Sequence, residues 1–394
     1  MYTSKLIIAI LLSTSLSAMA NNEFNLCLEK LEKEAPSKGV LSSVFFENTK
    51  NLTPNMKLIE NLNFQPEFKT PIWDYISLLV EEDRISEGKL MLQKHEEILN
   101  NVHEKYGVNP YTVVAVWAVE SNFGQNFGKY NLVESLGTLS CFGRRTTFFQ
   151  GEFFSALRII QEGHIKKEDL KGSWAGAFGH TQFMPTTFEK LAVDFDNDGR
   201  KDLITSIPDA LASTANFLKN AGWKDSIPWG YEVKIPMNFD INGHSRKNKL
   251  SHEEWVSKGV TLADGSILPS NIGNSGLMMI SGVKGPLFLV NKNFDAIYKY
   301  NAAESYALAI SYLSQRLEKD TRFITPWPTY DGPLNREQRV ILQKILVSKG
   351  HEIGEIKGDI GPKTRSAIKF EQQKLGIEQN GRAGEKIFKL LNEN

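Results

Sequence analysis

The sequence contains two cysteines and has a formal net charge of zero, and the apolar run near its N-terminus is brief. Basic and acidic residues number 46 each, so no global field draws the chain to nucleic acid or to an anionic membrane. The apolar run, Leu6 to Leu12, is too short to span a bilayer well. Hydrophobic residues at 41% and charged residues at 23% instead fit a soluble globular protein.

The N-terminus has the order of features of an export signal. Lys5 supplies the positive charge, the apolar run follows, and Ala18-Met19-Ala20 forms a small-residue cleavage site. We therefore predict a signal peptide over residues 1–20 and a periplasmic protein without a transmembrane segment after cleavage. The alternative is an uncleaved anchor. Cys27 lacks the small-residue context of a lipidated cysteine.

The two cysteines, Cys27 and Cys141, would lie in an oxidising compartment if the chain is exported. A disulfide between them would hold the N-terminal segment near residues 142–145. The alternative is two unpaired thiols, because the sequence does not give the distance that decides it.

A buried helix that leads to a carboxylate is expected within residues 109–128. Asn109 is typical of an N-cap and Pro110 of the first helical residue. Residues 111–119 are apolar apart from Thr112, which indicates a core helix. Glu120 ends this run, and lost hydration would raise its pKa, as a general acid requires. The alternative is a structural glutamate that is paired with an arginine or caps a turn.

A second informative stretch runs from Gly172 to Pro185. Its glycine and alanine spacers would let backbone approach a ligand closely. Ser173, Gln182 and Phe183 offer the hydrogen bonds and flat apolar faces that sugars need. His180 has no second metal ligand at a suitable spacing, so we expect a solvated loop histidine.

The stretch that begins at Asp194 resembles a calcium loop, with alternating carboxylates and glycine at the sixth position. The twelfth position is Thr205 rather than glutamate, and Asp209 is the best candidate to close the shell. The ion would be structural, since Ca²⁺ is a poor generator of nucleophilic water. The alternative is an Asp-rich surface turn. The candidate ligands are Asp194, Asp196, Asp198, Arg200 through its carbonyl, and Asp209.

The Glu-Ser-Asn-Phe-Gly motif at Glu120 resembles the catalytic motif of the lytic transglycosylases that cut bacterial cell-wall glycan. Gly143-Arg144-Arg145 with Phe148-Phe149, and the stretch from Gly172 to Pro185, resemble the membrane-bound lytic transglycosylase B family in particular. The similarity covers about residues 24–318. It implies a mainly α, lysozyme-like catalytic domain. The alternating residues Tyr231, Val233 and Ile235, and the two apolar runs 277–280 and 287–290 that flank a turn at residues 282–285, predict a hairpin and a small β-sheet insertion.

The resemblance also implies which residues contact the glycan. Arg144 and Arg145 would hold peptide or lactyl carboxylates, or alternatively pair with carboxylates of the protein. Tyr75 would line the sugar groove, although an aromatic beside proline is more often a packing residue. Gln182 lies in the family's loop that faces the catalytic glutamate. The implied substrate-binding residues are Tyr75, Arg144, Arg145, Ser173, Gln182, Phe183, Tyr300, Asn301 and Tyr306.

The C-terminal residues resemble a three-helix peptidoglycan-binding domain, with helices expected over 336–348, 364–375 and 384–391. Lys357 stands where an aspartate is usual. The alternative is an inert module. The predicted domains are a catalytic domain over 21–320, a proline-stiffened linker over 321–334 and the binding domain over 335–394.

The motif offers one carboxylate, whereas glycosidases usually need two. The resemblance implies that Glu120 acts alone, without a cofactor, and that the products carry 1,6-anhydromuramyl ends. The expected partner is the glycan strand of peptidoglycan. Glu134 and Glu152 follow helical patterns that suggest solvated faces. The alternatives are a hydrolytic muramidase and a non-catalytic wall-binding scaffold. A calcium sensor is disfavoured because one loop lacks the paired helices of such switches.

Overall fold

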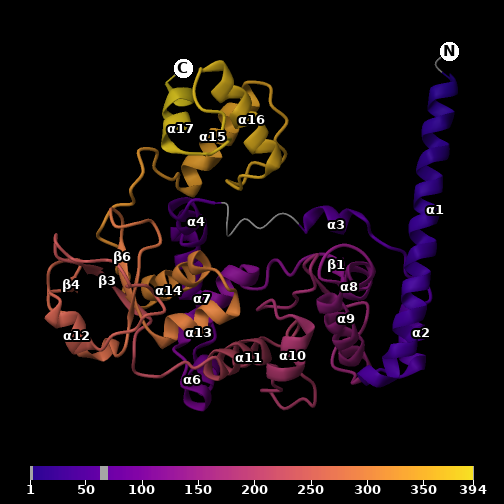
Figure 1. Cartoon of the computed structure of the whole chain (residues 1–394), viewed down its shortest axis with the longest axis horizontal. Coiled ribbons are helices and arrows are strands. Elements are labelled where there is room, and N and C mark those ends of the chain that lie inside the picture. Colours follow the sequence, from indigo (N-terminus) through magenta and orange to yellow (C-terminus); the bar gives the residue numbers. More distant parts are fainter. Residues whose placement is uncertain (1–2, 63–69, 394) are drawn as a thin grey trace. The chain divides into compact units, whose positions relative to one another are not determined.

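The computed structural model describes residues 3–62 and 70–393, and helices dominate its regular structure (Figure 1). The chain forms two compact units. The first joins Met1–Gln65 to His95–Phe217, and the second joins Pro66–Lys94 to Leu218–Asn394. Each unit therefore contains separate stretches of chain, and the predicted domain boundaries stay predictions.

The first unit is almost entirely helical. Its short strands β1 and β2 pair antiparallel, with Tyr130 opposite Gly172. The division between the units falls within the last helix, α11. The elements are α1 (Thr3–Glu34), η1 (Ala35–Lys38), α2 (Ser42–Thr49), α3 (Lys57–Asn61), α6 (Glu96–Tyr106), α7 (Pro110–Ser121), β1 (Tyr130–Asn131), α8 (Leu132–Cys141), α9 (Thr146–Gln161), β2 (Lys171–Gly172), α10 (Pro185–Leu191) and α11 (Ile207–Asn220).

Helices α8 and α9 form the centre of packing in the first unit. They contact each other extensively, and α1, α2 and α10 pack against one or the other. Cys27 on α1 and Cys141 at the end of α8 form a disulfide with their Cα atoms 5.8 Å apart. Of the two alternatives that the sequence left open, the structure has the bridge. It ties the N-terminal helix to the core.

The apolar residues spaced among charges over residues 84–105 predict a single amphipathic helix, but two helices occupy this stretch. Helix α5 (Glu82–Lys94) ends before His95, and α6 begins at Glu96. His95 leaves helical geometry at φ −113° and ψ 25°, and its buried ring packs edge-on against Trp117 at 5.5 Å. A tertiary contact accompanies this break, and neither proline nor glycine marks it in the sequence.

The second unit contains the small sheet that the alternating residues predicted. Its strand order is β4-β3-β6-β5, and every pairing is antiparallel. Leu277 lies opposite Leu289, which confirms the expected hairpin around residues 282–285. A core that includes Trp255, Ile272 and Leu287 packs on the sheet. The strands are β3 (Gly230–Lys234), β4 (Thr261–Leu262), β5 (Gly276–Met278) and β6 (Leu287–Val290).

The second unit also contains helices, of which α13 packs on β6 and the last three form the C-terminal group. Helix α14 packs on α4, α5 and α13. The helices are α4 (Ile72–Leu79), α5, α12 (His252–Ser257), α13 (Lys292–Tyr300), α14 (Glu304–Lys319), α15 (Arg336–Ser348), α16 (Pro362–Lys374) and α17 (Glu385–Asn392), with the 3-10 turn η3 (Ser270–Ile272).

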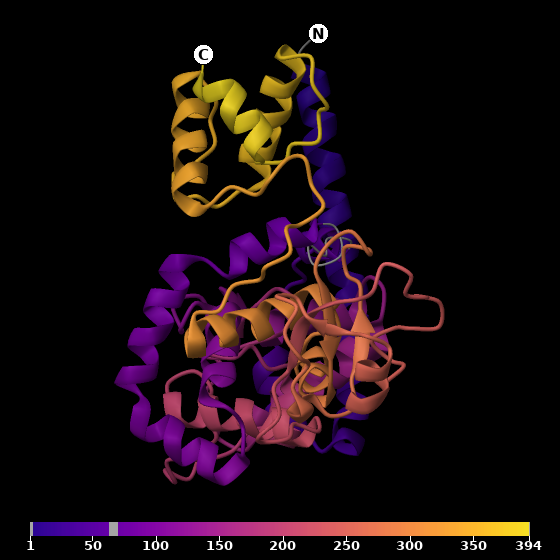
Figure 2. The ribbon, with the colours of Figure 1, turned by 90° about the vertical axis from the view of Figure 1, so that its left-hand side faces the viewer.

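Helices α15, α16 and α17 form a compact group with its own core, which confirms the three helices expected there (Figures 1 and 2). Two buried glutamines stabilise its turns in the same way. The side chain of Gln343 accepts a hydrogen bond from the Gly358 N–H, and that of Gln372 accepts one from the Gly381 N–H. Both glycines have positive φ, a backbone conformation that glycine adopts at little steric cost.

The predicted linker lies against the sheet of the second unit. The carboxylate of Glu232 on β3 accepts hydrogen bonds from the backbone N–H groups of Ile324 and Thr325, both at 2.7 Å. The Phe323 ring stacks on Tyr312 at 3.9 Å. These contacts fix the start of the segment that leads to α15.

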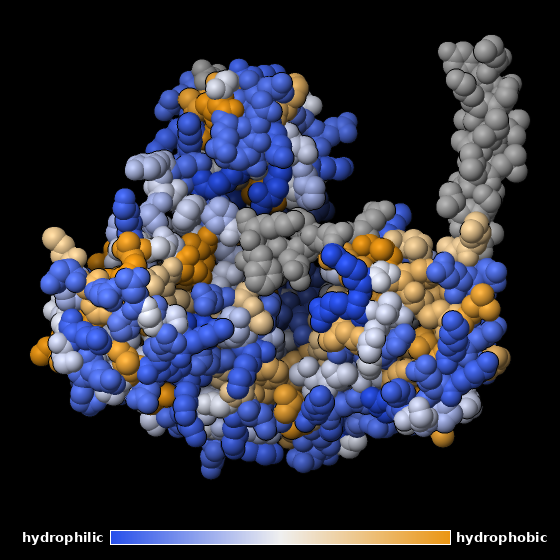
Figure 3. Space-filling model, in the orientation of Figure 1, coloured by the Kyte–Doolittle hydropathy of each residue, from blue (hydrophilic) through white to orange (hydrophobic). Residues whose placement is uncertain are grey.

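Among the described residues, none of the helices has the length and apolar character needed to cross a bilayer. The face seen in Figure 3 is mainly hydrophilic, with hydrophobic residues in small groups. Residues 1–18 include most of the predicted signal peptide, and their side chains lie outside the described part of the chain. The signal peptide stays a prediction.

We expect the disulfide to contribute substantially to stability, because it links residues with a sequence separation of 114. Restricting the unfolded chain over such a loop is worth about 2–4 kcal/mol in typical cases. The double substitution Cys27→Ala/Cys141→Ala should lower the free energy of unfolding by about that amount. Urea unfolding with and without reductant measures it. A loss below about 0.5 kcal/mol would show that the bridge adds little.

Candidate active site

Helix α7 carries Glu120 and is buried along nearly its whole length. The Asn109 side chain accepts hydrogen bonds from the N–H groups of Tyr111 and Thr112, which confirms the predicted N-cap. Residues 112–118 are buried, as the apolar run predicted. Glu120 is half-buried in the last turn of the helix. A rigid helix therefore delivers one carboxylate to a partly hydrated position.

The chain turns sharply after α7, through three residues with positive φ. Asn122, Phe123 and Gly124 have φ values of 49°, 58° and 85°. The hydroxyl of Ser121 accepts a hydrogen bond from the Gly124 N–H at 2.9 Å, which closes the turn. A Cβ on Gly124 would lie 2.3 Å from the His180 ring, so only glycine fits beside it.

His180 joins α7 to the loop of residues 172–183. Its Nδ1 accepts a hydrogen bond from Trp117 Nε1 at 3.0 Å, and its carbonyl accepts one from Ser121 Oγ at 2.5 Å. The residue is 8% exposed, and burial lowers its pKa from 6.5 to about 4. The expectation of a solvated histidine is therefore wrong. His180 is a neutral acceptor in the core, and its sequence separation of 63 from Trp117 left no signal in the sequence.

The glycines of this loop pack against protein. A Cβ on Gly172 would meet the Ala177 carbonyl at 2.1 Å, and one on Gly179 would meet the Leu203 carbonyl at 2.5 Å. A Cβ on Gly176 would meet the Leu136 side chain at 2.6 Å. Close approach is required, as the sequence indicated, but the partners at these three positions are other parts of the protein.

Gln182 and Ser173 are the loop residues best placed to meet a ligand. Gln182 is half-buried with φ 52°, and its amide nitrogen donates to the carbonyls of Phe127 and Gly179. This arrangement leaves the amide oxygen for another donor. Ser173, also half-buried, accepts a hydrogen bond from the Ala177 N–H. Phe183 differs from its prediction, because its ring is 2% exposed and packs near Phe217, where it supports the loop from beneath.

Arg144 and Arg145 are exposed at the start of α9. Arg145 has φ 66°, and its guanidinium carbon lies 4.3 Å from the centre of the exposed Phe148 ring. Cation–π contact of this kind is worth about 0.5–1 kcal/mol at an exposed site. It keeps the charge accessible, so Arg145 stays compatible with binding an anion.

The remaining predicted groove residues belong to the second unit. Tyr75 lies on α4 and is half-buried, and α4 packs against α14, the helix of Tyr306. Tyr306 is 2% exposed and stacks against the half-buried Tyr300 at 6.5 Å. Asn301, next to Tyr300, is half-buried. The second unit thus brings Tyr300 and Tyr306 together, and it places Tyr75 on a helix that packs against the helix of Tyr306.

The two other candidate carboxylates have structural partners. Glu152 is 2% exposed and accepts hydrogen bonds from both the N–H and the hydroxyl of Thr186, so it caps α10. Its expected solvated position is wrong. Glu134 is half-buried and accepts a hydrogen bond from the Asn55 side chain at 3.3 Å. These bonds hold Glu152 and Glu134 in structural roles.

Three of the predicted calcium ligands converge. Asp194, Asp196 and Asp209 each offer an oxygen within 4.8 Å of the others, and Asp194 Oδ1 is buried with no hydrogen-bond partner. Burial raises the pKa of Asp209, whose carboxylate also accepts backbone hydrogen bonds. An unpartnered carboxylate oxygen between two other carboxylates fits a hard cation.

The other two predicted ligands are arranged differently. Asp198 is exposed and forms an ion pair with the Arg200 side chain at 3.0 Å, so its carboxylate lies outside the group of three. Gly199, at the sixth position of the loop, has φ 90°, and its N–H donates to Asp194. The loop therefore has the tight turn expected of a cation site, with fewer converging carboxylates than predicted.

We expect the burial of His180 to make stability depend on pH. Its folded pKa, about 4, lies below its unfolded value of 6.5, so the unfolded chain binds the proton first as pH falls. Stability should decline from about pH 6.5 towards pH 4, by about 2 kcal/mol at pH 5 from this group alone. Urea unfolding at pH 7 and pH 5 measures the difference.

The matched variants are His180→Gln, which retains an acceptor for Trp117, and His103→Gln, at a partly exposed site. The first should reduce the stability difference between pH 7 and pH 5, and the second should leave it unchanged. An unaltered difference in His180→Gln would exclude His180 as its source.

Comparison with known proteins places this architecture in a family. The chain matches the family model described as "Transglycosylase SLT domain" over residues 23–315, and the "Putative peptidoglycan binding domain" over residues 335–391. It is 31% identical over 244 residues to membrane-bound lytic murein transglycosylase B of Escherichia coli (strain K12). That alignment covers 61% of this chain and 66% of the relative.

Solved structures agree with this assignment. SltB3 from Pseudomonas aeruginosa, solved in complex with NAG-anhNAM-pentapeptide, is 38% identical with a TM-score of 0.75, and the match covers 94% of this chain and 99% of that one. The Escherichia coli lytic transglycosylase Slt35, solved in complex with calcium, is 26% identical with a TM-score of 0.64, covering 75% and 93%. This chain therefore belongs to the SLT-domain family of lytic transglycosylases and carries a C-terminal peptidoglycan-binding domain.

Proposed function

We propose that this chain cleaves the bond between N-acetylmuramic acid and N-acetylglucosamine in peptidoglycan without water, leaving 1,6-anhydromuramyl ends. The observation that carries the proposal is Glu120, a single half-buried carboxylate at the end of a buried helix. Glu134 and Glu152 have structural partners, so the described first unit favours one-carboxylate chemistry. Family membership supports the same reaction.

Glu120 would act twice in this reaction. As an acid it gives its proton to the glycosidic oxygen while the bond from that oxygen to muramyl C1 breaks. As a base it then takes the proton of the muramyl C6 hydroxyl, and O6 forms a bond with C1. The carboxyl group is thereby restored, no water is consumed, and no cofactor is needed.

The surrounding residues would bind and orient the glycan. The Gln182 amide oxygen and the Ser173 hydroxyl would take hydrogen bonds from substrate groups near Glu120. Tyr75, Tyr300, Asn301 and Tyr306 would shape the groove, with Tyr306 supporting Tyr300 from behind. Arg144 and Arg145 would attract the carboxylates of lactyl or peptide groups. Phe183 would hold the loop in place without touching sugar.

The same substrate places the protein outside the cytoplasm. We propose export through the signal peptide over residues 1–20 and a periplasmic location, which the Cys27–Cys141 bridge supports because disulfides persist in oxidising compartments. The C-terminal domain over residues 335–394 would bind the wall and hold the enzyme near its substrate. Lys357 pairs with Glu355 on its exposed surface.

Asp194, Asp196 and Asp209 would hold a structural Ca²⁺ ion. The unpartnered, buried oxygen of Asp194 supports this, as does the calcium complex of Slt35. The Asp198 carboxylate would join the shell only if its ion pair with the Arg200 side chain opened, and the Arg200 backbone carbonyl stays a candidate ligand. The ion would neutralise clustered carboxylates and would take no part in the cleavage.

Replacing the acid tests the reaction. Glu120→Gln removes the transferable proton, so we expect glycan release to fall by at least about 10²-fold. Mass spectrometry of products from isolated peptidoglycan measures this, and anhydromuramyl ends should come from the parent. Glu134→Gln is the matched control and should give the same products as the parent. Reducing ends would indicate a muramidase. No release by the parent, with binding to the wall intact, would indicate a scaffold.

Calcium should raise thermal stability if the carboxylates hold it. Saturation at about 100-fold above the dissociation constant should stabilise the fold by about 2.7 kcal/mol. Thermal unfolding with Ca²⁺ or with chelator measures the shift for the parent, for Asp194→Asn and for Asp240→Asn, an exposed control. The shift should vanish only in Asp194→Asn. An equal shift in all three would place the ion elsewhere.

A further inference from the structure

The C-terminal helices of the second unit contact α4 and the start of α5 through ion pairs of low exposure. The carboxylate of Asp74 accepts two hydrogen bonds from the Arg382 guanidinium, at 2.5 and 2.7 Å. These side chains are 15% and 14% exposed. Glu81, between α4 and α5, pairs with Arg339, and these are 9% and 5% exposed. The two-point contact between Asp74 and Arg382 fixes orientation as well as distance.

The two arginines are also held by the C-terminal domain or by the linker that precedes it. Arg339 donates to the carbonyls of Gly358 and Leu334, at 2.7 and 2.8 Å. The Leu334 carbonyl also accepts a hydrogen bond from Ser77 on α4 at 3.0 Å. Arg382 pairs with Asp331 in addition to Asp74. Each arginine is therefore anchored on its own side, so the ion pairs connect α4 to a framework and not to flexible side chains.

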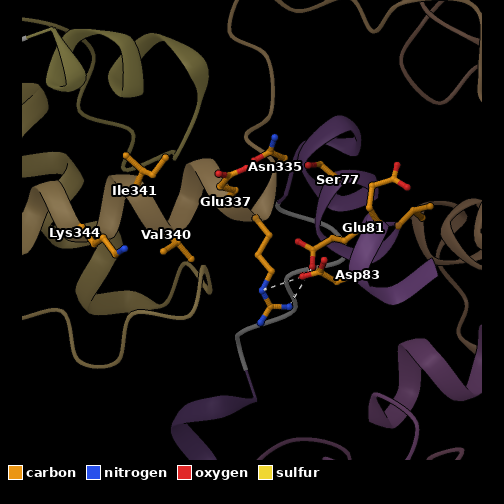
Figure 4. A pocket seen from close by; sticks show the side chains of 11 residues that line it. Ser77, Glu81, Asp83, Asn335, Glu337, Val340, Ile341 and Lys344 are labelled. Atoms are coloured by element: carbon orange, nitrogen blue, oxygen red, sulfur yellow. Dashed lines mark ion pairs between the residues drawn. The ribbon is translucent and has the colours of Figure 1, made fainter. Parts of the chain in front are cut away.

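A cavity of about 660 Å³ lies beside this contact, between α15 and the α4–α5 turn (Figure 4). Glu81 and Asp83 come from one side, and Asn335, Val340 and Lys344 come from the other. Across it, Arg336 reaches Glu81 at 3.6 Å and Asp83 at 4.0 Å. Arg336 and Asp83 are 43% and 75% exposed, so water screens their pair. The buried pairs of Asp74 and Glu81 therefore dominate the contact.

Helix α4 depends on its neighbours because it has only eight residues, too few to be stable alone. One neighbour is α14, against which α4 packs. The C-terminal domain, which pairs with Asp74 on α4 and with Glu81 just after it, is another. Asp74 directly precedes Tyr75, so a shift of the Asp74 backbone moves Tyr75 with it.

We propose that the Asp74–Arg382 and Glu81–Arg339 pairs dock the C-terminal domain on α4, and that this docking positions Tyr75 in the glycan groove. Asp74 and Arg382 are then positioning residues for the reaction. The proposal rests on the proposed function, since it takes Tyr75 as a groove residue. The C-terminal domain therefore affects the rate of cleavage even for a glycan too short to be held by binding to the wall.

Hydrogen exchange tests the docking without any need for activity. Arg382→Met removes the guanidinium and keeps much of the side-chain length. We expect amide exchange over residues 72–79 to become at least about tenfold faster. The matched control is Lys389→Met, which removes an exposed ion pair with Glu385 on α17, and it should leave α4 unchanged. Unchanged exchange in Arg382→Met would overturn the docking, whether or not the chain is an enzyme.

Kinetics on a soluble peptidoglycan tetrasaccharide test the link to Tyr75. We expect kcat/KM of Arg382→Met to fall about tenfold or more, because a misplaced groove residue weakens alignment. Arg382→Lys keeps the positive charge but loses the guanidinium that makes two parallel hydrogen bonds, so it should restore part of the lost kcat/KM. In a Tyr75→Ala background, Arg382→Met should add little further loss. Lys389→Met should match the parent.

Two kinetic results would overturn the proposal while leaving the proposed function intact. One is a kcat/KM for Arg382→Met within about twofold of the parent. The other is full additivity of the Tyr75→Ala and Arg382→Met losses, since independent sites add. Circular dichroism confirms folding, and Glu81→Gln repeats the exchange measurement if Arg382→Met does not fold. Absence of cleavage by the parent would overturn the proposed function, and the exchange result would still stand.

Discussion

The candidate active site depends on one buried tie, in which Trp117 and Ser121 of α7 both bind His180. Trp117 donates to the imidazole and Ser121 donates to the backbone carbonyl, so helix and loop are held at two points. Burial keeps the imidazole neutral, which lets Nδ1 accept the indole hydrogen bond. Glu120, the immediate neighbour of Ser121, takes its position from these two hydrogen bonds. The geometry of the acid is therefore fixed by residues that need no contact with substrate.

In the second unit, too, contacts of a neighbouring residue hold a predicted site residue in place. A short helix, α4, carries Tyr75 and obtains its order from α14 and from the C-terminal domain. Buried ion pairs are costly to break, since each leaves an uncompensated charge, and they specify geometry more than they add net stability. In both units a predicted site residue is the sequence neighbour of a residue that makes the stabilising contact. Asp74 precedes Tyr75 just as Ser121 follows Glu120.

Sequence reasoning was strongest where a local pattern carried the information. The N-cap at Asn109, the buried apolar run, the hairpin around residues 282–285 and the three C-terminal helices were all predicted and are present. It failed where a distant contact overrode the local pattern. His95 breaks a helix beside Trp117, His180 is buried, and Glu152 caps α10. The Phe183 side chain is buried, whereas its neighbour Gln182 is half-buried.

The sequence by itself determined the family, the mainly helical class, the order of elements and the identity of the candidate acid, because short-range periodicity and motif spacing encode these features. Only the tertiary structure decided that Cys27 meets Cys141, that three carboxylates converge around Asp194, and that the C-terminal domain docks on α4. Each of those contacts joins residues far apart in the chain. Their distances follow from how whole helices pack, and no local pattern of residues records that packing.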